Sequence, residues 1–404
     1  MLSSPFSIRG SSAVFNRPGG EVMTKTQPEP HLIDDTLGRV YSIDPPRWRS
    51  DEGNPLSVSE LPGIRRQLID GSQRSLWRYH AALPVPIEHP VSMGEGCTPL
   101  IPRPWNGHPC LFKLEWFAPT GSFKDRGASV MLSLLRQQGV DSVLEDSSGN
   151  GGAAVAAYGA AAGIRVRVIA PVYAQDAKIA QIRAFGAEVQ LVDGPREASE
   201  TEAIRQSDHT FYASHNWHPF FLQGTKTLGY ELWEDLGFQT PDNVIIPTGA
   251  GSNVLGCDLA FRELMRAGEI DRLPRLFCTQ PANCAPIHAH FQAAPGDVVA
   301  PQFAATIAEG TAIKKPVRLK QVLDAVRRSG GSTVAVSEAQ IVAALKRLTG
   351  MGFYVEPTCA SAAAALDLLW ERGDIGAGER TVVVLTGSGL KATAFMTNTF
   401  GDVG

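Results

Sequence analysis

The chain between residues 142 and 213 alternates short apolar segments with segments of helical spacing, and this alternation restricts the possible folds more than any other feature. The apolar segments are residues 142–146, 165–170, 188–192 and 210–213; the helical ones are 153–162, 175–185 and 198–206. Gly163 and Gly186 follow two of the helical segments, as C-terminal glycines commonly do. Parallel strands need a long crossover, usually a helix. The pattern therefore predicts an α/β fold with helices around a parallel sheet.

The same alternation continues at larger spacing along the rest of the chain. A helix is predicted over 124–138 and strands over 110–115, 243–247, 276–278 and 381–385. Further helices are predicted over 224–236, 254–267, 319–328, 338–349 and 360–372, and a long loop over 293–317. A chain of 404 residues exceeds one typical domain. We expect two domains, each a mainly parallel twisted sheet flanked by helices.

The domain boundaries are predicted from changes in pattern along the chain. Residues 1–75 are rich in Pro, Gly and Arg and show little periodicity, so they are predicted to form an irregular N-terminal arm. The small α/β domain is predicted over 128–223, and the large domain over 76–127 plus 224–404. Residues 1–22 are expected to be a disordered tail, or to precede a translation start at Met23.

Composition excludes several classes of function. The formal net charge is −4 and no dense Lys/Arg block occurs, which argues against nucleic acid or an anionic membrane as the main partner. No apolar run reaches the ~18 residues of a membrane-spanning helix. The six cysteines are scattered without a CxxC pair, so neither a metal site nor a disulfide framework is indicated. We expect reduced thiols in a cytoplasmic protein.

Lys124 is the first candidate catalytic residue. It follows a Gly-Ser turn and starts a predicted helix. A lysine that forms a Schiff base with a cofactor aldehyde must be partly deprotonated, and a desolvated, cation-poor site at a helix N-terminus favours that state. The alternative for an isolated lysine is a surface ion pair with Asp125. The rest of the sequence must therefore supply a phosphate site, a ring contact and a carboxylate site.

Residues 249–253 are the candidate phosphate site. They form a Gly-rich turn between a predicted strand and a predicted helix, an arrangement that holds phosphate on backbone N–H groups. No Walker lysine follows, and Gly256 is too distant for GxGxxG, so nucleoside triphosphate and dinucleotide sites are disfavoured. An ordinary βα turn is the alternative.

Two further polar turns follow predicted strands. The N–H groups and hydroxyls of residues 147–152 are suited to a substrate carboxylate, and Asn150 to an aromatic oxyanion; ordinary capping of an Ala-rich helix is the alternative. A hydroxyl in residues 386–389 is suited to a heteroaromatic nitrogen, with a solvated turn as the alternative. Open parallel sheets bind ligands at the carboxyl ends of their strands. With Lys124, these turns fit one cofactor, pyridoxal phosphate.

Residues 119–128, PTGSFKDRGA, resemble the lysine motif of fold-type-II pyridoxal-phosphate enzymes, the superfamily of tryptophan synthase β, cysteine synthase and threonine dehydratase. They are most similar to threonine synthases. The similarity extends over residues 75–395 through further motifs in the family's order at 77–79 with 83–85, 95–100, 147–150, 356–357 and 385–391.

The resemblance implies a role for each candidate residue. Lys124 would form the Schiff base and shuttle protons, Phe123 would lie near the ring, and Asn150 would contact the phenolic oxygen. Thr386, or less favourably Ser388, would face the pyridine nitrogen, and a hydroxyl there suits elimination or replacement better than transamination. The phosphate would be held by Gly249, Ala250, Gly251, Ser252 and Asn253, and the substrate by Ser147, Ser148, Gly149, Asn150 and Gly151.

The implied function is that of a lyase, a threonine synthase that converts O-phosphohomoserine and water to threonine and phosphate. The chain departs from the family pattern at Gly151-Gly152, where the family has Thr and Ser, and at Ala250; residues 307–316 look closer to serine/threonine dehydratases. The alternative is therefore a dehydratase-like or β-replacement enzyme for another small amino acid, and a third hypothesis is a non-catalytic binding protein. The resemblance also implies a homodimer.

Overall fold

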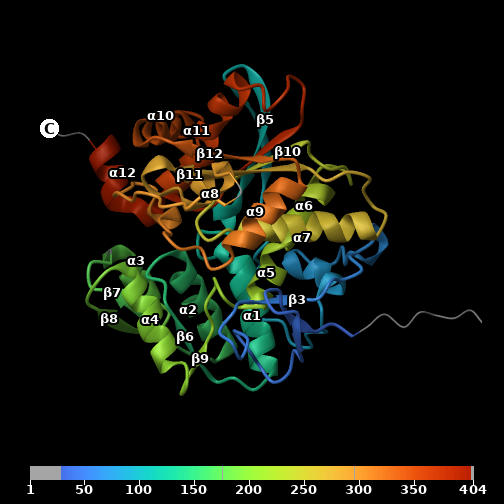
Figure 1. Ribbon diagram of the computed structural model, residues 1–404, viewed down its shortest axis with the longest axis vertical. Helices are drawn as coiled ribbons and strands as arrows, with labels where there is room; N and C mark the ends of the chain where they lie inside the picture. The colour runs from blue at the N-terminus through green and yellow to red at the C-terminus, as the bar shows by residue number, and fades with distance from the viewer. Residues whose placement is uncertain (1–28, 175, 295, 402–404) are drawn as a thin grey trace, which may run out of the picture.

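A computed structural model describes residues 29–401, except residues 175 and 295 (Figure 1). The tail or alternative start that we predicted for residues 1–22 lies outside the described residues. Within the described part, no helix combines the length and the apolar character needed to cross a membrane.

The first of two larger sheets is fully parallel, with the strand order β8-β7-β6-β9. Its strands are β6 (Ser142–Glu145), β7 (Arg165–Pro171), β8 (Glu188–Val192) and β9 (Phe211–Tyr212). The crossovers are α2 (Asn150–Ala162), α3 (Asp176–Ala184) and α4 (Arg196–Gln206), drawn in green in Figure 1. Gly163 and Gly186 both have left-handed φ angles, 71° and 82°. The predicted α/β alternation is thereby confirmed.

The second sheet has six strands in the order β12-β11-β10-β13-β5-β4. The strands are β4 (Leu100–Trp105), β5 (His108–Leu114), β10 (Asn243–Pro247), β11 (Arg275–Pro281), β12 (Ser332–Val336) and β13 (Thr381–Leu385). All pairs are parallel except β4 with β5, whose two-residue turn has positive φ at both Asn106 and Gly107, as a type I′ hairpin requires.

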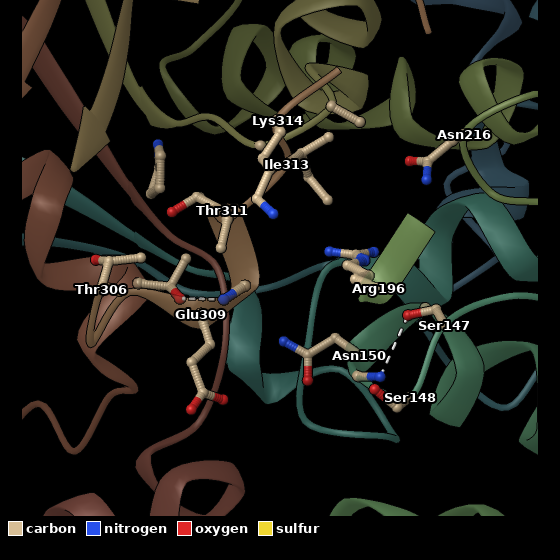
Figure 2. Close-up of a pocket in the computed structure, with 18 of the residues that line it drawn as sticks. Ser147, Ser148, Asn150, Arg196, Asn216, Thr306, Glu309, Thr311, Ile313 and Lys314 are labelled. Atoms are coloured by element: carbon tan, nitrogen blue, oxygen red, sulfur yellow. Dashed lines mark hydrogen bonds between the residues drawn. The ribbon is translucent and has the colours of Figure 1, made fainter. Parts of the chain in front are cut away.

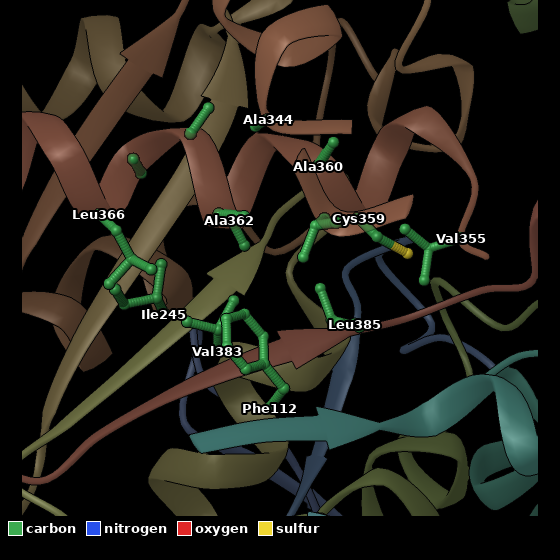
Figure 3. Close-up of a cluster of buried hydrophobic side chains, with 14 of the residues drawn as sticks. Phe112, Ile245, Ala344, Val355, Cys359, Ala360, Ala362, Leu366, Val383 and Leu385 are labelled. Atoms are coloured by element: carbon green, nitrogen blue, oxygen red, sulfur yellow. The ribbon is translucent and has the colours of Figure 1, made fainter. Parts of the chain in front are cut away.

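Helices cover both faces of the six-stranded sheet. On one face, α11 (Pro357–Glu371) packs through Ala360, Ala362 and Leu366 toward Ile245 and Val383 of the sheet (Figure 3), and α10 (Glu338–Gly350) packs against α11. The other face is covered by α6 (Thr227–Asp235), α7 (Ser252–Arg266) and α9 (Leu319–Arg328). Small residues on α11 let its backbone lie close to the sheet, so the strand ends are rigidly placed.

Several elements differ from the sequence-based expectation. We predicted an irregular arm for residues 1–75, but an antiparallel sheet of β1 (Leu32–Asp34), β2 (Arg39–Tyr41) and β3 (Leu56–Val58) forms there, and its Leu32 and Leu56 are buried with Trp77. Strands of three residues are too short to show periodicity. The predicted elements also omit β12, α5 (Pro219–Thr225), α8 (Pro286–Gln292) and α12 (Thr393–Phe400).

The domain boundaries stay a prediction. Each of the two larger sheets takes all its strands from one predicted domain. However, α1 (Lys124–Gln137) spans the predicted boundary at residues 127/128 and packs against both α2 and α5. Lys124 therefore starts a helix that crosses the boundary between the two predicted domains.

Candidate active site

A cavity of about 800 Å³ lies where strands of both sheets end. Its walls include residues at or within two positions of the ends of β6, β7, β10 and β13, together with the start of α1. Figure 2 shows Ser147, Ser148 and Asn150 on one side of this cavity and Thr311 and Lys314 on another. The structure thus brings together at the cavity the predicted residues Phe123, Lys124, Ser147, Ser148, Gly149, Asn150, Gly151, Gly249, Ala250, Gly251, Ser252, Asn253 and Thr386.

Lys124 reaches the cavity from the first turn of α1. Its Nζ lies 4.8 Å from the ring centroid of Phe123 and 5.6 Å from that of Phe221. Burial lowers the pKa of Lys124 from 10.5 to about 8, the nearby carboxylates of Glu145 and Glu356 oppose the shift, and Arg196 adds to it. A fraction of the amine is therefore deprotonated near neutral pH, as a nucleophilic lysine requires.

Asp125 does not act as the ion-pair partner of Lys124. Its carboxylate accepts hydrogen bonds from the Thr120 backbone N–H at 2.7 Å and from the Thr120 hydroxyl. Among the described residues, Lys124 has no salt bridge, whereas Asp125 is fully buried under the turn that precedes α1. The alternative of a surface Lys–Asp pair is therefore wrong, and Asp125 shapes the turn that places the lysine.

A buried charge network holds α1 in place two residues after Lys124. Arg126 donates to Glu115 at 2.7 and 2.8 Å and to Glu231 at 2.9 and 3.0 Å. Lys113 on β5 also donates to Glu231, at 2.6 Å. Arg126, Glu115 and Lys113 are each 0% exposed. Pairing of every charge offsets the cost of burial, and it ties α1 to the six-stranded sheet and to α6.

Asn150 lies at the start of α2, and only one of its two side-chain amide atoms has a hydrogen-bond partner among the described residues. Its Nδ2 donates to Glu356 Oε1 and Oε2 at 3.0 and 3.3 Å, whereas its buried Oδ1 has no partner among the described residues. Gly387 permits this approach, because a Cβ there would lie 2.3 Å from Glu356 Oε1. The amide thus has hydrogen-bonding capacity left for a bound molecule.

The loop at residues 249–253 also fits a polar ligand. Gly251 has φ +95°, and a Cβ on it would lie 2.3 Å from Val322 Cγ2, so only glycine suits this position. Both amide atoms of Asn253 are buried and unpaired within the described residues. The first N–H groups of α7 lack intrahelical partners and attract anions. The loop therefore offers donors for a phosphate.

Thr386 and Ser388 were alternatives for the pyridine nitrogen, and they lie in different environments. Thr386 is buried at 2% exposure and lines the cavity. Ser388 caps a short 3-10 helix, where its hydroxyl accepts from the Leu390 N–H at 3.3 Å, and it is not among the lining residues of the described chain. Thr386 is the better placed of the two.

Several lining residues were not among our candidates. Glu356 lies in a motif that we recognised but to which we gave no role. Arg196, the first residue of α4, lies at the cavity in Figure 2, and within the described chain no ion pair involves it. His215 is 4% exposed and also lines the cavity. Neither Arg196 nor His215 lies in a Gly-rich turn, so the sequence carried no local signal for them.

The groups at the cavity fit pyridoxal phosphate on three independent features. They are a lysine of lowered pKa, a glycine-lined loop at a helix N-terminus and a buried hydroxyl at a strand end. The amide of Asn150 adds a free oxygen that accepts hydrogen bonds, while its Nδ2 donates to Glu356. The family model described as "Pyridoxal-phosphate dependent enzyme" matches residues 91–387. The fold and site thus define a pyridoxal-phosphate enzyme of fold type II.

Known proteins agree with this class. The chain is 34% identical over 369 residues to the threonine synthase of Methanocaldococcus jannaschii, covering 88% of this chain and 91% of the relative. It is 35% identical over 327 residues to the threonine synthase of Methanosarcina acetivorans, covering 78% and 80%. A fungal L-serine ammonia-lyase from Rhizomucor miehei superposes with a TM-score of 0.66 at 21% identity, covering 76% and 98%. The chain belongs to the pyridoxal-phosphate-dependent enzyme family.

Proposed function

We propose that this enzyme is a threonine synthase, which converts O-phosphohomoserine and water to threonine and phosphate. Its threonine synthase relatives cover most of the chain. The observation that carries the proposal is one cavity that holds both Lys124, whose pKa is lowered to about 8, and Arg196, a guanidinium without an ion pair in the described chain. A deprotonatable amine and an unpaired cation suit a substrate that loses a proton and a phosphate.

Each predicted site residue takes a role in this proposal. Lys124 would hold the cofactor covalently, and Asn150, Thr386 and residues 249–253 would hold its polar atoms. When bound, pyridoxal phosphate supplies an electron sink that acidifies the substrate's Cα–H. The freed amine of Lys124 would move the proton at Cα and then the proton at Cβ. Arg196 would neutralise charge on the phosphate that departs from Cγ, and water would add at Cβ.

The start of α2 supplies a site for the substrate carboxylate. The first helical hydrogen bond of α2 is donated by the Ala153 N–H to Gly149 O at 3.1 Å. The N–H groups of Asn150 and Gly151 therefore have no helical acceptor within the described chain and are available to a ligand. Helix N-termini favour carboxylates through these donors and the helix dipole. Ser147, Ser148 and Gly149 complete the turn, in which Ser147 Oγ accepts from the Gly149 N–H at 3.2 Å (Figure 2).

A second candidate is a dehydratase-like or β-replacement enzyme acting on an amino acid without phosphate. The observation that favours it is the absence of hydroxyl side chains at Gly151 and Gly152. These positions also have no room for them, because a Cβ on Gly151 would lie 2.7 Å from the His215 ring and one on Gly152 would lie 1.8 Å from Ser147 O.

Product analysis of the purified holoenzyme separates the candidates. With O-phosphohomoserine we expect equal amounts of threonine and inorganic phosphate. Ammonia and a keto acid from serine or threonine, without phosphate release from phosphohomoserine, would instead establish the second candidate. Lys124→Ala should lose the visible cofactor absorbance and all turnover. A wild type that binds pyridoxal phosphate but converts none of these amino acids would favour the non-catalytic hypothesis.

We further propose that the enzyme is a cytoplasmic homodimer, as the family resemblance implies. In support, apolar side chains are exposed on adjoining segments: Phe117 at 62%, Tyr354 at 44% and Leu390 at 70%, with Gly389 N–H bonded to Tyr354 O at 3.0 Å. Exposed apolar patches mark interaction sites. Light scattering should give a dimer mass that falls in Leu390→Glu, and a fluorescent fusion would test the compartment.

A further inference from the structure

A buried histidine–carboxylate pair lies beside the proposed catalytic lysine and has no role in the chemistry described so far. Glu145 ends β6 and is 0% exposed, and His215 is 4% exposed at the cavity wall. His215 Nδ1 lies 2.7 Å from Glu145 Oε1, and the His215 backbone N–H donates to Glu145 Oε2 at 3.2 Å. One carboxyl group therefore fixes both the ring and the backbone of this histidine.

The segment that carries His215 is held firmly on its far side. Arg318 donates to the Trp217 carbonyl at 2.6 Å and to the Asn216 carbonyl at 3.3 Å. His218 caps α5, its Nδ1 accepting from the Phe220 N–H at 3.2 Å. Because the residues that follow His215 are held by these hydrogen bonds, the imidazole has a defined position in the cavity wall.

The imidazole occupies space that the family pattern gives to a side chain of the turn. A Cβ on Gly151 would lie 2.7 Å from both His215 Cε1 and Nδ1. The family resemblance places a threonine at this position, and here the turn has glycine instead. The imidazole of His215, which comes from another element, thus lies against the turn at the point where the family pattern has a hydroxyl side chain.

The protonation state of the pair follows from its burial. Burial raises the pKa of Glu145 to about 8 and lowers the pKa of His215 well below its usual range. Lys124 of α1, Asp146 after β6 and Arg196 of α4 are the other charged groups that act on the pair. At neutral pH a protonated Glu145 donates to Nδ1, so the ring proton lies on Nε2. Nε2 has no hydrogen-bond partner among the described residues.

We propose that Glu145 and His215 form a proton relay that protonates the leaving oxygen of the substrate, with Arg196 as the cation that receives the leaving group. This rests on the proposed function, in which a phosphate departs from Cγ. Arg196 is close enough to the pair for its charge to act on both pKa values, so the cationic site and the proton donor serve the same region of the cavity.

The chemistry of the leaving group requires such a donor. A phosphate monoester is mainly a dianion at neutral pH, since its second pKa is about 6, and without a proton it would depart as a trianion. As the Cγ–O bond breaks with its electron pair on oxygen, the Nε2 proton passes to that oxygen and hydrogenphosphate leaves. The Glu145 proton passes to Nδ1 in the same event. The pair is left as a carboxylate and a neutral imidazole, and solvent restores the proton.

Three variants test the relay in the holoenzyme. His215→Gln removes the proton donor, and Glu145→Gln keeps an amide beside Nδ1 but has no acidic proton to pass on. His218→Gln is the matched control, because it changes a neighbouring buried histidine that caps α5. We expect all three to keep the visible cofactor absorbance. His215→Gln and Glu145→Gln should lower kcat for phosphate release by about 10²–10⁴-fold with little change in KM, and His218→Gln should not.

The relay also predicts the direction in which kcat changes with pH. Because the relay donates from protonated Glu145, kcat of the wild type should fall as pH rises through the pKa of Glu145. That fall should be absent from the residual activity of Glu145→Gln. Retention of full kcat in both relay variants would overturn the proposal, as would a wild-type rate that rises over the same range.

A measurement without substrate keeps the relay testable if the proposed function fails. The infrared difference between the wild type and Glu145→Gln should show, at pH 6, one extra carbonyl band of a protonated carboxylic acid in the wild type. That extra band should vanish as the pH is raised past the pKa of Glu145, whereas the bands of the other buried carboxyls, such as Asp125, are common to both proteins. Carboxylic-acid bands that are all identical in the two proteins at pH 6 would overturn the relay. Glu145, Asp146 and His215 have ligand atoms within 4.8 Å of one another, so stoichiometric divalent metal in the purified holoenzyme would also overturn it.

Discussion

Replacement of Lys124 by methionine should make the cofactor-free protein more stable. The fold holds the lysine amine where its charged form is disfavoured, and this lowers its pKa from 10.5 to about 8. At about 1.36 kcal/mol per pH unit, the full shift is worth roughly 3 kcal/mol. Part of the side chain faces the cavity, where water reduces the penalty, so we expect a gain of about 1–3 kcal/mol. Methionine has a similar length and packs well against Phe123 and Phe221.

The gain should depend on pH with a defined sign. The folded lysine has a lowered pKa, so the unfolded state binds more protons between pH 8 and pH 10.5, and wild-type stability rises with pH there. The advantage of Lys124→Met is therefore fully present below pH 8 and disappears as the pH approaches 10.5. Between pH 7 and pH 9.5 it should fall to less than half.

Urea denaturation of the cofactor-free proteins at pH 7 and pH 9.5 measures this difference. Lys320→Met is the matched control, because Lys320 is 90% exposed and forms a surface ion pair with Asp324. The stability of this variant should change little at either pH. Two results would refute the reasoning: a Lys124→Met protein no more stable than the wild type at pH 7, or a gain that does not shrink at pH 9.5. Either would mean that the fold does not strain the lysine toward its neutral form.

Three further perturbations test the surroundings of the lysine. Glu231→Gln should lower the free energy of unfolding by about 3–5 kcal/mol, because Arg126 and Lys113 lose a shared buried partner. As a control, Asp141→Asn at the exposed pair with Arg165 should leave the urea midpoint nearly unchanged. Gly251→Ala should weaken pyridoxal phosphate binding at least tenfold in an absorbance titration, because the added Cβ collides with Val322. The control Gly268→Ala should bind the cofactor normally, because Gly268 also has a positive φ but a Cβ there meets no other atom. Thr386→Val should lower kcat about tenfold, which corresponds to the loss of one buried hydrogen bond. Ser388→Ala should leave kcat unchanged. A loss of kcat in Ser388→Ala but not in Thr386→Val would mean that Ser388 contacts the pyridine nitrogen.

Local patterns in the sequence predicted much of the fold and many of the residues that line the cavity. Gly163 and Gly186 mark helix ends because left-handed backbone favours glycine. The turns at residues 147–152 and 249–253 could be predicted because strand, Gly-rich turn and helix are neighbours along the chain. β12 was missed because its sequence STVAV is less apolar than the equally long β10 (NVIIP) and β13 (TVVVL). α12 was missed because a helix of eight residues gives weak periodicity. The attachment of α1 to the six-stranded sheet depends on charges far apart in sequence.

The part of the site proposed to receive the leaving group was not predictable, because its residues come from segments without a shared local pattern. Glu145 and His215 are separated by 70 positions, and no spacing rule links the end of one strand to a loop after another. Arg196 appeared only as a residue at the start of a predicted helix, where an exposed position is the usual expectation. The sequence contained the residue types, but only the fold shows which of them share a cavity.

Gly151 and Gly152, which stand where the family pattern has Thr and Ser, have a different meaning in the fold than in the sequence. From the sequence, the loss of Thr and Ser weakened the case for a phosphorylated substrate, because hydroxyl donors were missing. In the fold, Gly151 is small because His215 lies against it, and Gly152 is small because the Ser147 carbonyl does. A donor at this wall is thus supplied from a different element, with Arg196 near it. The departure therefore counts against the phosphate substrate only if His215 cannot donate, which the His215→Gln and Glu145→Gln variants decide.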